Sequence, residues 1–343
     1  MKNNQLMIYG AYGYAGELMV REAVAQRLRP IIAGRDAEKL KPIATELSLE
    51  CRAFGVRNTG SNLQDISVLL NCAGPFSATA EPLARACLAQ QIHYLDITGE
   101  IDIFRKCHAL DEEARQQNVL ILPGAGTDIV PTDCLAAMLK EKLPVATRID
   151  LALSFGTNPS IGTVNTMIES FGKGGLIREG GMLKVVSNAF QMRKIPFQNK
   201  PQWAMTIPWG DVFTSGISTG VPDGAVYMAM PRMSIYMIRL TNPVKGILNT
   251  QFGQKITKRL AGWLMKKGPD AKALEAGRGQ FWGEAEAPDG EKLEMTMSTP
   301  NVYALTATVG IRIAQYCLDY TGPGGYYTPS MLLGSRFIES IPG

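Results

Sequence analysis

Short apolar runs alternate with amphipathic stretches through the first 125 residues, and each apolar run ends at Gly, Asn, Asp or Pro. Apolar runs with such ends predict β-strands, and the amphipathic stretches predict helices between them. The expected strands are 5–9, 30–33, 51–56, 68–71, 93–96 and 119–122, and the expected helices are 15–26, 38–47, 79–90 and 101–116. This βαβ rhythm predicts an α/β fold with a parallel, doubly wound Rossmann sheet. Pro42 is expected to kink or shorten the second helix.

The character of the sequence changes after one more expected helix, 133–142. From about Arg148, turns rich in Gly, Ser and Thr separate Met-rich apolar runs and strands of mixed length, which predicts a second, α+β domain. The last twenty residues are expected to be helical, because Thr328 can cap a helix whose first position is Pro329. We therefore predict a dinucleotide-binding domain over 1–145, a substrate or dimerisation domain over 146–322 and a C-terminal helix over 323–343.

Three glycines follow the first expected strand and open the first helix, in the order Gly10-Ala-Tyr-Gly13-Tyr-Ala-Gly16. In a dinucleotide-binding loop the first glycine permits a tight turn, the second lets a pyrophosphate approach the backbone, and the third lets the helix pack on the strand. The N-terminus of the helix then faces the phosphates. The strand, loop and helix in this order favour a cofactor site over a merely structural turn. The expected cofactor-binding residues are Gly10, Tyr12, Gly13, Tyr14, Ala15 and Gly16.

Two further strand ends are expected beside this loop. The second strand ends in Gly34-Arg35-Asp36. A carboxylate there would hold the ribose 2′-hydroxyl of NAD, whereas a cation suits the 2′-phosphate of NADP. Gly34 leaves room for a phosphate and Arg35 supplies a guanidinium fork that suits it, so NADP is favoured. The structural alternatives are a solvated surface arginine at Arg35 and a plain helix cap at Asp36. The fourth strand ends in small residues that predict a ribose contact or a tight turn: Cys72, Ala73, Gly74, Pro75 and Phe76.

Composition narrows the possible classes of protein. The 343 residues carry 35 basic and 31 acidic side chains, a net charge of +4, and the basic residues look scattered, which argues against nucleic-acid binding. Six single cysteines without metal-ligand spacing indicate reduced, mostly buried thiols, a cytoplasmic location and neither zinc nor disulfides. No signal peptide is expected. The apolar window 226–240 is too short and too charged to span a bilayer, although association with a membrane surface stays open.

Several segments together resemble the saccharopine dehydrogenase-like oxidoreductases, and within that group they look most like the trans-acting enoyl reductase branch. They include Asn71-Cys-Ala-Gly-Pro-Phe76 and His93-Tyr-Leu-Asp-Ile-Thr-Gly-Glu100, and they run in order through most of the chain: 10–16, 33–35, 71–76, 93–100, 124–128, 131–133, 210–211, 218–220, 282–284 and 324–334. The resemblance implies a Rossmann domain and a second domain with a mixed sheet for substrate binding or dimerisation. It also implies a C-terminal helix that returns to the first domain, and a homodimer.

Hydride transfer to or from a nicotinamide needs a group that supplies or removes one proton. The chain has only two histidines, and His93 is better explained as a packed or edge residue of a strand and His108 as a surface residue of a helix. Asp96 and Glu100 follow the fifth strand, and Asp128 lies in the next loop at the same edge. These three carboxylates are the candidate catalytic residues. Their structural alternatives are a turn-closing side chain, a favourable charge at a helix start and a partner for a helix N-terminus, respectively.

The second domain has no recognisable array of Arg and Lys of the kind that binds a dicarboxylate. Its apolar and hydroxyl side chains predict a small to medium, largely uncharged substrate, with candidate contacts at Phe155, Thr157, Asp211 and Tyr227. We therefore predict an NADP-dependent reductase, without a metal ion, that acts on a C=N or activated C=C bond. Two alternatives stay open: a non-catalytic NADP-binding sensor or scaffold, and a trans-acting enoyl reductase whose substrate is held by a carrier or a lipid.

Overall fold

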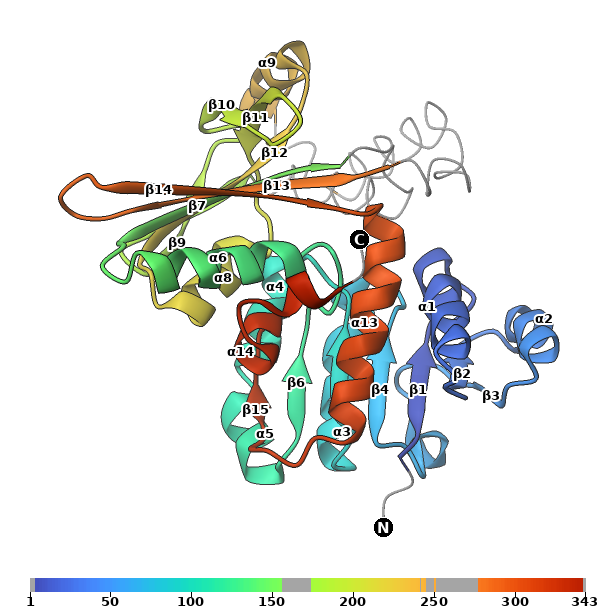
Figure 1. Cartoon of the computed structure of the whole chain (residues 1–343). Coiled ribbons are helices and arrows are strands. Elements are labelled where there is room, and N and C mark those ends of the chain that lie inside the picture. The colour runs from blue at the N-terminus through green and yellow to red at the C-terminus, as the bar shows by residue number, and fades with distance from the viewer. Residues whose placement is uncertain (1–3, 156–173, 241, 245–249, 251–276, 342–343) are drawn as a thin grey trace. The chain divides into compact units, whose positions relative to one another are not determined.

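The computed structural model describes residues 4–155, 174–240, 242–244, 250 and 277–341 (Figure 1). Backbone packing divides the chain into two units, of which the first joins Met1–Val130 to Tyr303–Pro342 and the second is formed by Pro131–Val302. The boundaries between the units thus lie after Val130 and Val302, whereas the sequence predicted boundaries after residues 145 and 322. Each unit is described by itself below.

The first unit is built on a seven-stranded sheet in the order β15-β6-β5-β4-β1-β2-β3. Every neighbouring pair is parallel, so the predicted parallel, doubly wound sheet is confirmed. The central strands are apolar and completely enclosed because helices cover such a sheet on both faces. The strands are β1 (Leu6–Tyr9), β2 (Ile31–Gly34), β3 (Cys51–Ala53), β4 (Val68–Asn71), β5 (His93–Asp96), β6 (Leu120–Leu122) and β15 (Gly325–Tyr326).

The helices of the first unit follow the predicted positions up to residue 117, with two differences. Pro42 lies inside α2 without ending it; its side chain is exposed, so water can solvate the carbonyl that loses its amide donor. The expected helix 101–116 is two helices, separated at Ala109 and Leu110. The helices are α1 (Tyr14–Ala25), α2 (Ala37–Leu47), α3 (Phe76–Ala89), α4 (Ile101–His108), α5 (Asp111–Gln117), α13 (Val302–Leu318) and α14 (Pro329–Leu333), with 3-10 turns η1 (Gly60–Leu63) and η3 (Phe337–Ser340).

The long helix α13 was not predicted, and it explains why the first unit resumes at residue 303. Figure 1 shows α13 beside α1 over the sheet. The two helices pack closely, since a Cβ added at Gly310 would lie 2.5 Å from Cε of Met19. The rings of Tyr14 and Tyr303 meet edge to face with centroids 5.2 Å apart. The chain therefore returns to the first unit before its last twenty residues.

The predicted C-terminal helix over 323–343 is present only in part, as the five-residue α14 in the first unit, and the short strand β15 precedes it. The hydroxyl of Thr328 caps it by accepting the backbone N–H of Met331 at 3.4 Å, and Pro329 occupies the first position. The helix is short, because Gly334 follows it with a φ of 87° and the chain then forms η3. All six cysteines lie in the described part of the chain and none of them forms a disulfide there; five are buried and Cys51 is exposed.

The second unit holds an eight-stranded sheet in which six strands follow the order β10-β11-β12-β7-β13-β14, β8 pairs with β12 and β9 pairs with β8. The pair β12·β7 is parallel and the other pairs are antiparallel, so the sheet is mixed, as expected. The strands are β7 (Arg148–Phe155), β8 (Gly175–Glu179), β9 (Met182–Val186), β10 (Met192–Pro196), β11 (Pro201–Thr206), β12 (Asp223–Ala229), β13 (Gly279–Glu286) and β14 (Lys292–Thr299).

Helices of the second unit cover one face of this sheet and extend it at one end. Leu135 and Leu139 of α6 lie against Gly283 of β13, next to Leu151 of β7. This packing places α6 in the second unit rather than in the first domain. The described helices here are α6 (Val130–Lys142), α8 (Asp211–Thr219) and α9 (Arg232–Leu240), with the 3-10 turn η2 (Asn242–Val244). Among the residues that the structure describes, every helix is too short or too polar to cross a bilayer.

Candidate functional site

The predicted phosphate loop joins β1 to α1 in a conformation that requires glycine. Gly10 has a φ of 85°, and a Cβ added there would lie 2.7–2.8 Å from three atoms of Ala73 in the turn after β4. A Cβ at Gly16 would lie 2.2 Å from the carbonyl oxygen of Gly10. The N-cap of α1 is Gly13, which has no side chain to bond the first amides of the helix. The loop therefore meets the requirements of a dinucleotide pyrophosphate site at a helix N-terminus.

Two cations and an aromatic ring lie where β2 ends. Tyr12 packs over Gly34, because a Cβ at Gly34 would lie 2.6 Å from Cε1 of Tyr12. Nζ of Lys39 lies 5.7 Å from the centroid of the Tyr12 ring, and the side chain of Arg35 is exposed. The carboxylate of Asp36 caps α2 by accepting two backbone N–H bonds at 3.1 and 3.3 Å. Because the acid serves the helix, this strand end suits a phosphate-bearing ribose better than a ribose diol.

A buried hydrogen-bond network links the carboxyl ends of β4 and β5. The side-chain amide of Asn71 donates to the hydroxyl of Tyr94 at 3.2 Å, and that hydroxyl donates to Oδ2 of Asp96 at 2.8 Å. Oδ1 of Asn71 accepts the backbone N–H of Ala73 at 3.0 Å. The network thus holds the turn 72–76, the segment expected to contact ribose.

Asp96 is completely buried and joins β5 to the loop after β6. Its Oδ1 accepts the backbone N–H groups of Thr98 at 3.0 Å and Gly124 at 3.1 Å. Burial raises the pKa of Asp96 to about 6, and the hydrogen bonds from Thr98, Tyr94 and Gly124 limit the rise because they favour the carboxylate. These contacts match the turn-closing role that was the structural alternative for this residue.

Asp128 and Glu100 lie at the same edge of the sheet and are both half-buried. Burial raises the pKa of Asp128 to about 7. Near neutral pH this carboxyl therefore populates both of its protonation states, which a group that exchanges a proton must do. Glu100 is the N-cap residue of α4, but its side chain makes no capping bond to the first amides of that helix.

The loop that carries Asp128 is tied to α13. The backbone N–H of Thr127 donates to Oγ1 of Thr306 at 3.2 Å, and the hydroxyl of Thr306 donates to Oγ1 of Thr127 at 3.0 Å. A Cβ added at Gly126 would lie 3.2 Å from Cγ2 of Thr306. The C-terminal part of the chain therefore helps to fix the position of the candidate proton carrier.

The candidate substrate contacts of the second unit lie in different surroundings. The Phe155 side chain is half-buried, with its ring centroid 6.4 Å from that of Trp209. Asp211 is completely buried in the first turn of α8, and Tyr227 is buried on β12. Thr157 falls outside the described residues.

Paired charges lie beside a buried apolar cluster, which includes Ala152, Ile195 and Trp282, on one face of the second sheet. The guanidinium of Arg193 donates to both carboxylate oxygens of Glu284 at 3.1 Å, and it lies 4.6 Å from the centroid of the Trp282 ring. Asp150, which is 4% exposed, pairs with Arg148 at 3.0 Å. Burial raises the pKa of Asp150, and the neighbouring arginines oppose the rise. The charges on this face therefore neutralise one another.

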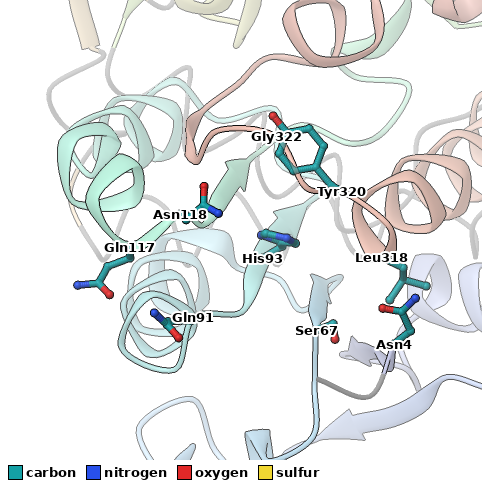
Figure 2. A pocket seen from close by; sticks show the side chains of 9 residues that line it. All are labelled: Asn4, Ser67, Gln91, His93, Gln117, Asn118, Leu318, Tyr320 and Gly322. Carbon is teal, nitrogen blue, oxygen red and sulfur yellow. The ribbon is translucent and has the colours of Figure 1, made fainter. Parts of the chain in front are cut away.

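Figure 2 shows a pocket of about 300 Å³ at the opposite, amino edge of the first sheet. Ser67 immediately precedes β4 and His93 begins β5, so the pocket lies at the strand ends away from the glycine loop. Nδ1 of His93 accepts the backbone N–H of Leu120 at 3.0 Å, which ties this half-buried side chain to the start of β6. The pocket is lined by Asn4, Ser67, Gln91, His93, Gln117, Asn118, Leu318, Tyr320 and Gly322.

Three residues of the candidate site were not singled out from the sequence. Tyr94 had a usable signal, because it stands two residues before Asp96 on one strand and so shares its face. Lys39 lies one helical turn after Arg35, and its position beside the Tyr12 ring follows from the N-cap of α2. Thr306 had no local signal, since it reaches the loop through the packing of α13.

Comparisons with known proteins include a family model that falls within the first unit. Residues 6–122 match the family model of the saccharopine dehydrogenase NADP binding domain, which confirms the predicted NADP-binding domain. A saccharopine dehydrogenase-like oxidoreductase of Rattus norvegicus is 26% identical over 231 residues, which cover 59% of this chain and 53% of the relative. A protein of Mycobacterium tuberculosis named as a trans-acting enoyl reductase is 28% identical over 206 residues, which cover 54% of this chain and 44% of the relative.

Among solved structures, apo saccharopine dehydrogenase (L-Glu forming) of Saccharomyces cerevisiae has a TM-score of 0.64 and 10% sequence identity. The match covers 97% of this chain and 96% of the yeast chain, and it supports the fold of both units. The chain spans about half the length of the curated relatives it matches. The resemblance to the saccharopine dehydrogenase-like oxidoreductases expected from the sequence is thus confirmed.

Proposed function

Because residues 6–122 match a saccharopine dehydrogenase NADP-binding domain, we propose that the chain is an NADP-dependent oxidoreductase. The proposed reaction moves hydride between NADPH and a C=N or activated C=C bond of a small to medium, largely uncharged substrate. The observation that carries the proposal is the glycine loop Gly10–Gly16, in which Gly10 lies in close contact with the turn after β4 and the Tyr12 ring packs over Gly34 at the end of β2.

The residues of the first unit divide into two groups in this proposal. The glycine loop and the turn 72–76 hold the dinucleotide, and Arg35 and Lys39 bind the 2′-phosphate as cations on either side of the Asp36 cap. When bound, NADPH supplies the hydride. Tyr12 covers Gly34 and narrows this end of the site.

Asp128 exchanges the proton that accompanies hydride transfer, because burial keeps its pKa at about 7. Asp96 acts as a positioning residue, since its carboxylate is fully buried and bonded to the two loops that frame the edge. Glu100 contributes negative charge at the start of α4.

The preference for an uncharged substrate rests on three arginines that the structure describes in the second unit, of which Arg178 is buried and Arg148 and Arg193 are half-buried. Arg193 and Arg148 are paired with Glu284 and Asp150. Arg178 is 4% exposed and donates to the backbone carbonyl of Val221 at 3.1 Å, and burial lowers its pKa to about 10. These arginines are used within the unit, so they provide no convergent site for a dicarboxylate. The substrate side then depends on Phe155, Thr157, Asp211 and Tyr227.

Replacing Arg35 by alanine tests the cofactor assignment. The affinity for NADPH should fall by roughly tenfold or more, because a charge-assisted hydrogen bond to the 2′-phosphate is lost, while the affinity for NADH should change little. Fluorescence titration of both cofactors measures the two constants. Arg85→Ala is a control, since Arg85 is an exposed arginine on α3 that pairs with Glu81. Equal losses for NADPH and NADH would remove the argument for phosphate recognition.

A second candidate is a trans-acting enoyl reductase with a carrier-bound or lipid substrate, which the name of the Mycobacterium tuberculosis relative favours. Oxidation of NADPH with free and carrier-bound enoyl, imine and carbonyl substrates separates it from the first proposal. NADPH binding without turnover of any of them would instead support a non-catalytic sensor or scaffold. The cytoplasmic location and the homodimer stay predictions.

A further inference from the structure

Helix α9 presents an apolar stripe to solvent. Met233, Met237 and Leu240 recur at the spacing of one helical face and are 71%, 59% and 72% exposed. Ile235 points the other way and is completely buried, and the helix packs against β11. Figure 1 shows α9 next to β10 and β11, at one end of the second sheet. The helix is therefore held by its opposite face, and the stripe forms part of the surface of the unit.

An arginine is fixed at each end of this stripe. The guanidinium of Arg232 lies 5.0 Å from the centroid of the Trp203 ring, and it donates to the hydroxyl of Tyr236 at 3.1 and 3.2 Å. Arg239 donates from Nε to the carbonyl oxygen of Ala189 at 2.8 Å. Cations beside an exposed apolar face are typical of helices that lie in the interface of a membrane.

The charge of the surrounding sequence is strongly one-sided. Residues 224–269 contain eight basic residues and no acidic ones. The rest of the chain holds 35 − 8 = 27 basic and 31 acidic residues, so the net charge of +4 combines +8 in this stretch with −4 elsewhere. The impression of scattered basic residues is therefore wrong for this stretch. The eight are Arg232, Arg239, Lys245, Lys255, Lys258, Arg259, Lys266 and Lys267.

We propose that α9 docks the protein on an anionic lipid surface, with Met233, Met237 and Leu240 inserted at the level of the headgroups. The positively charged guanidinium groups of Arg232 and Arg239 attract the anionic lipids, and the stripe supplies apolar contact. A bilayer accepts a protruding stripe without a complementary groove. The hydroxyl of Tyr236 beside the stripe is already bonded to Arg232, so a protein partner would gain little directional recognition there. This proposal does not depend on the proposed reaction.

Flotation of the full chain with lipid vesicles tests the proposal. The protein should float with vesicles of phosphatidylcholine and phosphatidylglycerol in equal parts and should stay behind with phosphatidylcholine alone. Met233→Asp/Met237→Asp should lower the bound fraction roughly tenfold or more, because two apolar contacts are lost and two negative charges are added. Raising the salt concentration should release the wild-type protein by screening.

Met182→Asp is the matched control, because Met182 is 73% exposed and lies at the start of β9. The turn before it is bonded to the segment that precedes β12, with Gly181 donating to Pro222 at 3.0 Å. Since α9 follows the other end of that seven-residue strand, the two sites are separated by about 20 Å. The control should float as the wild type does.

Circular dichroism checks that each variant is folded, and Leu240→Ser replaces the double variant if that one is not. Three results would overturn the proposal: wild-type protein that does not prefer anionic vesicles, a folded stripe variant that floats normally, or equal loss in Met182→Asp. Retention on an immobilised acidic carrier protein without vesicle binding would also overturn it and would assign the stripe to a protein partner.

Discussion

Replacing Gly10 by alanine disturbs the contact between the glycine loop and the turn after β4. The added Cβ would stand 2.7–2.8 Å from N, Cα and Cβ of Ala73, whereas ordinary contacts begin at 3.4 Å, so the loop and the turn must separate by about 0.6–0.7 Å. Such overpacking costs roughly 1–3 kcal/mol, and a left-handed φ of 85° adds roughly 1–2 kcal/mol for a residue with a Cβ. The total is about 2–5 kcal/mol.

This separation moves two segments that are proposed to hold the cofactor. We therefore expect the Kd for NADPH, measured by fluorescence titration, to rise at least roughly tenfold, which corresponds to about 1.4 kcal/mol. Gly290→Ala is the matched control, because Gly290 has a φ of 89° but nothing within 4 Å of an added Cβ. It should lower the thermal midpoint and leave NADPH binding unchanged. A folded Gly10→Ala protein with the wild-type Kd would refute the reasoning.

Two further predictions concern the carboxyl edge of the first sheet. Since burial raises the pKa of Asp128 to about 7, turnover that needs its protonated form should fall as the pH rises through about 7, and Asp128→Asn should lose this dependence. The folded state also holds this proton more tightly than the unfolded chain, so thermal stability should fall from pH 3.8 toward pH 7 more steeply in the wild type than in the variant. An unchanged pH profile of activity would exclude Asp128 as the proton carrier. Tyr94→Phe removes the hydroxyl between Asn71 and Asp96 and should lower the free energy of unfolding in urea by roughly 1–3 kcal/mol, so a change below about 0.5 kcal/mol would count against the buried network.

The first sheet could be predicted from sequence because its signals are local. The strands Val68–Asn71 and His93–Asp96 lie at the residues expected, since a strand buried on both faces reads as an uninterrupted apolar run with polar residues at its ends. The glycine loop was also predictable, because the constraint acts on its own backbone.

Helix α13 could not be predicted in the same way. It contains β-branched residues such as Val309, Ile311 and Ile313, which favour strands over helices when taken alone. Its packing against Met19 of α1 outweighs that preference, and this contact joins residues almost 300 positions apart. The early start of the second unit has a similar origin, because α6 follows the first sheet in sequence but packs under the second.

The residues of the candidate site also divide into those that local sequence predicts and those that depend on distant contacts. Arg35 could be named from the end of an expected strand, whereas the contact between Thr127 and Thr306 depends on α13. The buried role of Asp96 depends on the loop after β6, whose Gly124 donates to it. Residues whose roles are set by such distant contacts need the three-dimensional structure.

Titration of the purified wild-type protein with NADPH and with NADH, followed by cofactor fluorescence, tests the central claim most directly. The glycine loop follows β1, and the cations Arg35 and Lys39 follow the neighbouring parallel strand β2 at the same edge of the sheet. We predict a change in NADPH fluorescence at micromolar concentrations, with NADPH bound roughly tenfold or more tightly than NADH. No change with NADPH, or tighter binding of NADH, would contradict the account.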